Sequence, residues 1–96
     1  MSSALEQAAE SLRSRLADSD FDGTARVEIE DEGVIRIAGG DVSVADGDAD
    51  VTIAATLDTF REIFDGTLSP TAAYMTGRMR IDGDMGAAMK LSRLLG

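Results

Sequence analysis

The chain has 96 residues, with 18 acidic and 9 basic side chains, a formal net charge of -9, and neither cysteine nor histidine. This composition excludes disulfides, thiolate metal sites, cysteine nucleophiles and any catalytic triad that needs a histidine base. Because so negative a surface repels phosphate, nucleic acid is not an expected partner, and the length predicts a single domain over residues 1–96.

No apolar run in the sequence approaches the ~18 residues that span a bilayer. Residues 1–7 also lack the basic and apolar regions of a signal peptide. The sequence therefore predicts no integral membrane segment and a cytoplasmic location.

The first predicted element is an amphipathic helix over residues 3–17. Its apolar side chains recur at helical spacing, while Glu6, Glu10 and Arg13 fall on the other side. The polar stretch 18–23 ends it. The apolar positions are Leu5, Ala8, Ala9, Leu12 and Leu16.

The period then changes from the helical value to two, which is typical of strands with one dry face. Four strands are predicted over residues 25–29, 34–38, 42–44 and 51–55, separated by tight polar turns. Consecutive strands with such short turns predict an antiparallel meander.

Helices are expected next, to cover the dry face. Residues 57–64 form an amphipathic helix with Thr56 or Asp58 near the N-cap and Gly66 just past the end. Ser69-Pro70 opens a short helix through residue 74. Residues 78–82 alternate as a fifth strand, and Asp84 caps a last helix to residue 95. This order predicts an α+β fold.

Residues 65–85 carry an ordered set of motifs that resembles the sterol-carrier-protein-2 family: a glycine, leucine and proline, then methionine and glycine, a strand flanked by basic residues, and Gly-Asp before the final helix. The resemblance implies a five-stranded, mostly antiparallel twisted sheet with helices packed on one face and an apolar tunnel between the layers. It also implies a lipid carrier without chemistry of its own. The motif positions are Gly66, Leu68, Pro70, Met75, Gly77, Gly83 and Asp84.

Two apolar groups are the candidate walls of a ligand site. Clustered methionines, with their unbranched and polarizable side chains, suit a site that re-packs around flexible ligands, although they also fill ordinary cores. A stripe on the helix 57–64 would form the opposite wall or part of the core. The candidates are Met75, Met79, Met85, Ala88 and Met89, and Leu57, Phe60, Ile63, Phe64 and Leu68.

Four cations are candidates for binding the carboxylate of a fatty acid or the head of an acyl-CoA. They are Arg78, Arg80, Lys90 and Arg93. The alternative is that these side chains only balance the acidic surface.

Residues 18–23 open like a calcium loop, with Asp18, Asp20 and Asp22 at alternate positions and Gly23 at the sixth. The twelfth position, however, is Ile29, where such a loop needs a glutamate. The pattern favours a polar helix-to-strand connection over a metal site.

The sequence predicts a protein without catalytic residues or cofactor, because its carboxylates lie in turns, caps and polar faces and not in apolar runs that would raise their pKa. The expected function is binding and transfer of a hydrophobic ligand: a fatty acid, an acyl-CoA, or a sterol-like or isoprenoid lipid. The alternatives are an accessory module that presents lipid to an enzyme and an interaction module that forms a homodimer through its apolar groove.

Overall fold

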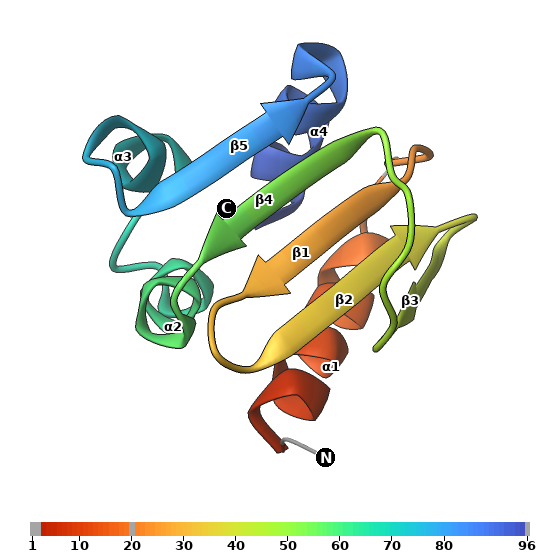
Figure 1. The fold of residues 1–96 in the computed structure, drawn as a ribbon, viewed down its shortest axis with the longest axis horizontal. Coiled ribbons are helices and arrows are strands. Elements are labelled where there is room, and N and C mark those ends of the chain that lie inside the picture. The colour runs from red at the N-terminus through yellow and green to blue at the C-terminus, as the bar shows by residue number, and fades with distance from the viewer. Residues whose placement is uncertain (1–2, 20, 96) are drawn as a thin grey trace.

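The computed structural model describes residues 3–19 and 21–95, which form four helices and five strands in the predicted order (Figure 1). The elements are α1 (Ser3–Ala17), β1 (Ala25–Ile29), β2 (Gly33–Ala38), β3 (Asp41–Ser43), β4 (Val51–Ala55), α2 (Leu57–Asp65), α3 (Pro70–Met75), β5 (Met79–Gly83) and α4 (Met85–Leu95).

The strands form one mixed sheet in the order β3-β2-β1-β4-β5. Three of the neighbouring pairs are antiparallel, whereas β1 pairs parallel with β4, in the register Ala25 to Val51. The α+β class and the mostly antiparallel sheet are thus confirmed. The predicted meander is wrong, because β4 lies beside β1 and not beside β3.

The parallel pair is possible because the chain between β3 and β4 crosses the sheet on the face away from the helices (Figure 1). Two arginines on that face hold the crossing segment. Arg26 donates to the carboxylate of Asp46 at 2.6 and 3.1 Å, and Arg36 donates to the backbone carbonyl of Asp48 at 2.9 and 3.1 Å. A crossover of this kind is what a parallel neighbour requires.

Several strand boundaries differ from the expected ones by one residue, and two of these differences have a clear structural reason. The third strand ends at Ser43, and Val44 is 46% exposed, because the chain leaves the sheet there to begin its crossing. The fifth strand begins at Met79, one residue later than predicted, because the backbone N–H of Arg78 donates to the carbonyl of Ala73 in α3 at 2.8 Å instead of continuing the strand.

The core lies between the other face of the sheet and the helices behind it (Figure 1). The alternation predicted for β1 and β2 is confirmed, since every second side chain is buried. Leu12 of α1 and Leu91 of α4 are fully buried against this face. Burying such side chains contributes about 1.5–3 kcal/mol each, which fixes α1 and α4 as the cover of the sheet.

The helix ends follow the predicted capping residues. Thr56 accepts a hydrogen bond from the Thr59 backbone at 3.2 Å, and Gly66 takes the left-handed conformation, φ 82°, that ends α2. Ser69 caps α3, whose first residue is Pro70. These caps set the positions at which α2 begins and ends beside α1.

The edge strand β3 has its outward-facing backbone groups paired within the chain. The Val42 carbonyl accepts from the Arg13 guanidinium of α1 at 2.9 and 3.2 Å, and the Val42 N–H donates to the Asp41 carboxylate at 2.9 Å. Arg13 therefore ties α1 to the edge of the sheet.

Across residues 3–19 and 21–95, none of the helices combines the length and the apolar character needed to cross a membrane.

Candidate functional site

A cavity of about 150 Å³ lies between α1 and α2. The side chains that α1 presents to it are mostly small, whereas α2 presents two phenylalanines and a leucine. Small side chains opposite large ones leave a space that neither helix fills. The lining consists of Ala4, Gln7, Ala8 and Ser11 of α1 and Leu57, Phe60, Arg61, Phe64 and Asp65 of α2.

Helical spacing brings these side chains to the cavity. Ala4, Ala8 and Ser11 are four and three residues apart, so they share one face of α1. Phe60 and Phe64 are four apart on α2, with ring centroids separated by 6.3 Å. The cavity is therefore a product of regular helix geometry and of the caps that position α2.

The same face of α1 continues to Arg15, four residues after Ser11. Its guanidinium donates to the carbonyl of Leu95 at 2.7 Å and to the carbonyl of Phe64 at 3.0 Å. Its central carbon lies 5.1 Å from the centroid of the Phe64 ring. Arg15 thus joins α1 to the C-terminal ends of α2 and α4, where the exposed carbonyls favour a cation.

Sequence reasoning missed Arg15, although its position relative to the small residues of α1 was a usable signal. A helix face that carries Ala4, Ala8 and Ser11 and then an arginine buries little apolar area of its own. Such a face needs a partner helix with larger side chains. The arginine then indicates the C-terminal end of that helix, where backbone carbonyls are free to accept hydrogen bonds.

The five predicted apolar residues of the 57–68 region lie at two adjoining cavities. Leu57, Phe60 and Phe64 line the cavity between α1 and α2. Ile63 and Leu68 line a second one, of about 240 Å³, beyond the C-terminal end of α2, and Phe64 lines this cavity too.

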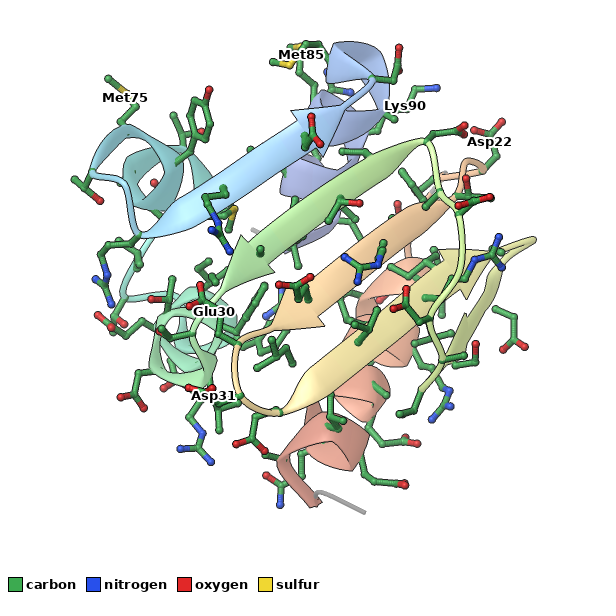
Figure 2. The ribbon with its side chains drawn as sticks, in the orientation of Figure 1. Asp22, Glu30, Asp31, Met75, Met85 and Lys90 are labelled. Atoms are coloured by element: carbon green, nitrogen blue, oxygen red, sulfur yellow. The ribbon has the colours of Figure 1, made fainter. Side chains whose placement is uncertain are left out.

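The predicted methionines lie elsewhere and are not brought together. Met79 and Ala88 belong to the packed core. Met75, Met85 and Met89 are 79%, 62% and 60% exposed, and Figure 2 shows Met75 and Met85 pointing away from the body of the protein. The reason is periodicity, because α4 turns Ala88, Leu91 and Leu95 inward and leaves its methionines on the other side.

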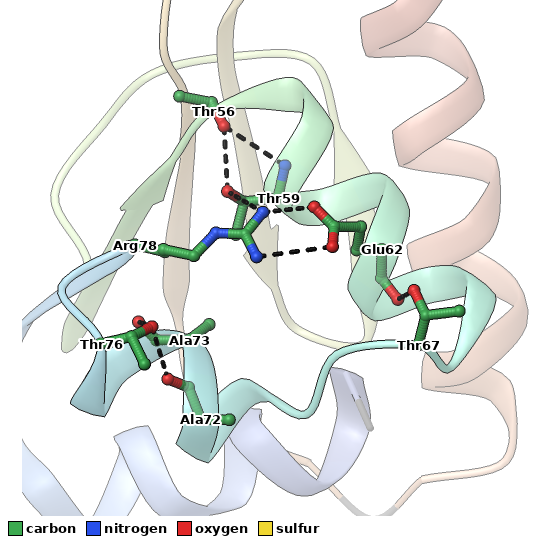
Figure 3. Close-up of polar contacts among 8 residues, drawn as sticks. All are labelled: Thr56, Thr59, Glu62, Thr67, Ala72, Ala73, Thr76 and Arg78. Atoms are coloured by element: carbon green, nitrogen blue, oxygen red, sulfur yellow. Dashed lines mark hydrogen bonds and ion pairs between the residues drawn. The ribbon is translucent and has the colours of Figure 1, made fainter.

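The four candidate cations separate into two groups. Arg78 and Arg80 pair with carboxylates: Arg78 with Glu62 of α2, close to Thr59 (Figure 3), and Arg80 with Glu30 at 3.8 Å. Lys90 and Arg93 line an open depression beside the end of α1, together with Arg15.

This depression concentrates positive charge on an acidic protein. Lys90 lies 3.9 Å from Asp22, a long contact (Figure 2), and Asp18 also lines the depression. No hydrogen bond or ion pair to the Arg93 guanidinium occurs among the described residues. Because Arg15 lines both this depression and the second cavity, the cationic and apolar regions adjoin.

The two carboxyl groups whose pKa is shifted belong to surface ion pairs and line neither of the two cavities described above. Hydrogen bonding to Arg78 lowers the pKa of Glu62, and hydrogen bonding to Arg26 lowers the pKa of Asp46. Both shifts favour the charged form, opposite to what a general acid needs at neutral pH.

The calcium-loop prediction includes Asp20, which lies outside the described residues. Among those that are described, no group of three or more carboxylates is placed to hold a metal ion.

Comparison with known proteins now identifies the family. The model of the SCP-2 sterol transfer family matches residues 3–96. The chain belongs to this family.

Curated proteins that match the chain are much longer. Hydroxysteroid dehydrogenase-like protein 2 from Homo sapiens is 38% identical over 63 residues, which are 64% of this chain but only 15% of the human protein. The match therefore concerns a small part of that relative.

Solved structures of the SCP-2 family share the fold. The crystal structure of sterol carrier protein 2 like 2 from Aedes aegypti has a TM-score of 0.79 at 22% identity and covers 94% of each chain. The solution structure of sterol carrier protein 2 from the same species, in complex with palmitate, has a TM-score of 0.78 at 18% identity, covering 100% of this chain and 97% of that one.

Proposed function

We propose that this chain binds and transfers a lipid, whose hydrocarbon part lies in the groove between α1 and α2. The observation that carries the proposal is the cavity between the small residues of α1 and the phenylalanines of α2. Membership of the SCP-2 sterol transfer family supports it, as does the palmitate complex of the Aedes aegypti sterol carrier protein 2.

The cavity is smaller than a lipid, so binding requires the groove to widen. Small-molecule pockets measure about 300–1,000 Å³, against about 150 Å³ here. Burying about 15 methylenes at ~0.8 kcal/mol each gives about 12 kcal/mol before any cost. If association and ordering remove half of that, the remaining ~6 kcal/mol corresponds to a Kd of some tens of micromolar.

The depression lined by Arg15, Lys90 and Arg93 supports an anionic head group, such as a carboxylate or the phosphates of an acyl-CoA. In this arrangement the head group contacts the cations while the chain runs into the apolar groove. Leu57, Phe60 and Phe64 of that groove can bury the chain, and the sequence has neither a histidine base nor a cysteine nucleophile to set beside it. The proposed role is therefore binding without catalysis.

The test is to fill the groove. Ser11 lines the cavity, and Ser14, on the same helix, is exposed and lines neither cavity. The palmitate affinity is measured by displacement of a fluorescent fatty acid. We expect Ser11→Phe to lower this affinity at least about tenfold, because a buried ring occupies the space of several methylenes. Ser14→Phe is the matched control and should bind like the wild type.

Equal palmitate affinities for the Ser11→Phe and Ser14→Phe proteins, both folded by circular dichroism, would contradict the proposed location. Absence of binding by the wild-type chain would contradict the function itself.

A second candidate is an accessory module that presents lipid to an enzyme or binds a second copy of the chain. Exposed Met75, Met85 and Met89 favour it, because large exposed apolar side chains often mark interaction sites. The place of the matched region within a longer, dehydrogenase-like relative is consistent with it. Native mass spectrometry separates the candidates: a co-purifying lipid mass supports the carrier, and a lipid-free dimer supports the interaction module.

A further inference from the structure

The two cavities of the groove adjoin at the C-terminal end of α2. The first lies between α1 and α2, and the second lies beyond the end of α2. Phe64 lines both of them, together with its neighbour Asp65. Of these two shared residues, Phe64 supplies the apolar side chain at the boundary between the cavities.

Contacts from α1 hold this ring in place. The Arg15 guanidinium lies over its face, 5.1 Å from the centroid, and donates a hydrogen bond to the carbonyl of the same residue at 3.0 Å. A second hydrogen bond, to the carbonyl of Leu95 at 2.7 Å, fixes the guanidinium itself. A cation over a ring face is attracted to it, so Arg15 favours the position in which Phe64 divides the groove.

The volumes indicate what the division does. The cavities measure about 150 and 240 Å³. Neither reaches the lower limit of about 300 Å³ for small-molecule pockets, whereas together they exceed it. A short hydrocarbon chain fits one cavity as it is. A long chain fits only if it occupies both.

Phe64 is also less deeply buried than its neighbour on the same face of α2, Phe60. Phe60 is 0% exposed and packed in the core, whereas Phe64 is half-buried at the surface. Rotation of the Phe64 ring toward solvent would open the boundary without disrupting the core.

We infer that Phe64 is a movable partition, held by Arg15, that determines which chain lengths the groove admits and how fast. This rests on the proposed lipid-binding function and adds a residue that sets specificity within it. Long-chain ligands must displace the ring before they can bind fully, while short-chain ligands do not.

The test measures association rates for octanoate, laurate and palmitate with the wild type and with Phe64→Ala. Loss of the ring should speed palmitate association about tenfold and leave octanoate nearly unchanged, with laurate between them. Arg15→Lys keeps the positive charge but loses the planar fork that reaches two carbonyls. Arg15→Lys should therefore also speed palmitate association most and octanoate association least, by smaller factors than Phe64→Ala.

Tyr74→Ala is the matched control, since Tyr74 is an exposed aromatic residue of α3 that lines neither cavity. Its rates should equal those of the wild type. If Phe64→Ala does not fold, Phe64→Leu removes the ring more gently and should show the same dependence on chain length.

A rate change by one common factor for all three acids, or no change, would overturn the partition while leaving the proposed function intact. If the wild type binds none of the three acids, the proposed function fails and the partition fails with it.

Discussion

Arg78 joins three elements at the surface, although it lies just outside β5. Its backbone N–H donates to the carbonyl of Ala73 in α3 at 2.8 Å, and its guanidinium pairs with Glu62 and contacts Thr59 of α2 (Figure 3). Its side chain is therefore engaged in fixing α2 and α3 against the start of β5, which leaves it less suited to bind a ligand head group than Arg93.

The pair of Arg78 and Glu62 predicts a specific acid sensitivity. Hydrogen bonding to Arg78 lowers the folded-state pKa of Glu62 below the ordinary value for a glutamate. Stability gained in this way is present above the unfolded pKa and is lost as the pH falls through the folded one. We expect Glu62→Gln to lower the melting temperature slightly at pH 7 and to have no effect at a pH below the folded pKa.

Calorimetry of both proteins at pH 7 and in acid measures this difference. Glu6→Gln, which alters an exposed carboxylate of α1, controls for the change in net charge. A gap between wild type and Glu62→Gln that persists or widens in acid would contradict the assignment.

The residue scale also shows where sequence reasoning stops. Phe60 and Phe64 share one helical face and were predicted together as site residues. Periodicity assigns them the same role, because it reports the face and not the neighbour. Only the packing of α1 shows that Phe60 is a fixed wall and that Phe64 lies at the boundary between two cavities.

At the scale of elements, local chemistry was sufficient for the helices. The helix α2 begins after Thr56 and ends before Gly66, as the capping preferences of these residues predict. The helix α3 likewise has Ser69 as its N-cap and Pro70 as its first residue. Strand positions also followed from the period of two. Strand pairing did not, because the same alternation suits a parallel or an antiparallel neighbour. The pairing of β4 with β1 depends on the segment that crosses the sheet between β3 and β4. Arg26 and Arg36 hold this segment through contacts between residues distant in sequence.

The turn from β5 into α4 offers a test of backbone geometry. Gly83 has φ 111°, and a Cβ at this position would lie 2.4 Å from the carbonyl oxygen of Asp50. Gly39 also has a positive φ, 59°, but a Cβ there would meet nothing within 4 Å. We expect Gly39→Ala to cost about 1 kcal/mol and Gly83→Ala about 3 kcal/mol, since only the second adds a backbone clash to the strain.

Urea unfolding of the two variants beside the wild type gives both values. Equal losses of stability would show that the start of β4 can shift away from Gly83, contrary to the close approach described above.

At the scale of the whole molecule, the excess of acidic residues predicts a response to salt. The protein measures 32 × 30 × 24 Å, while the Debye length is about 30 Å at 0.01 M ionic strength and about 8 Å at 0.15 M. In dilute buffer, repulsion among the charges, whose net is -9, is therefore hardly screened across the molecule. Raising sodium chloride over this range should increase the melting temperature by about 2–5 °C, because repulsion destabilises the compact state.

The matching control is the same titration near pH 4.2, the isoelectric point of the sequence. Net repulsion is absent there, so the increase should largely disappear. A similar increase at both pH values would assign the effect to salt in general and not to the charge of the protein.

The pairing of Val42 has a consequence for how molecules of this protein meet. Open edges of sheets are places where a neighbouring chain can add a strand. On β3, the N–H and carbonyl of Val42 that an added strand would need are already hydrogen-bonded to Asp41 and Arg13. The strand is also only three residues long. Addition of a further strand on this side is thus hindered, even at high protein concentration.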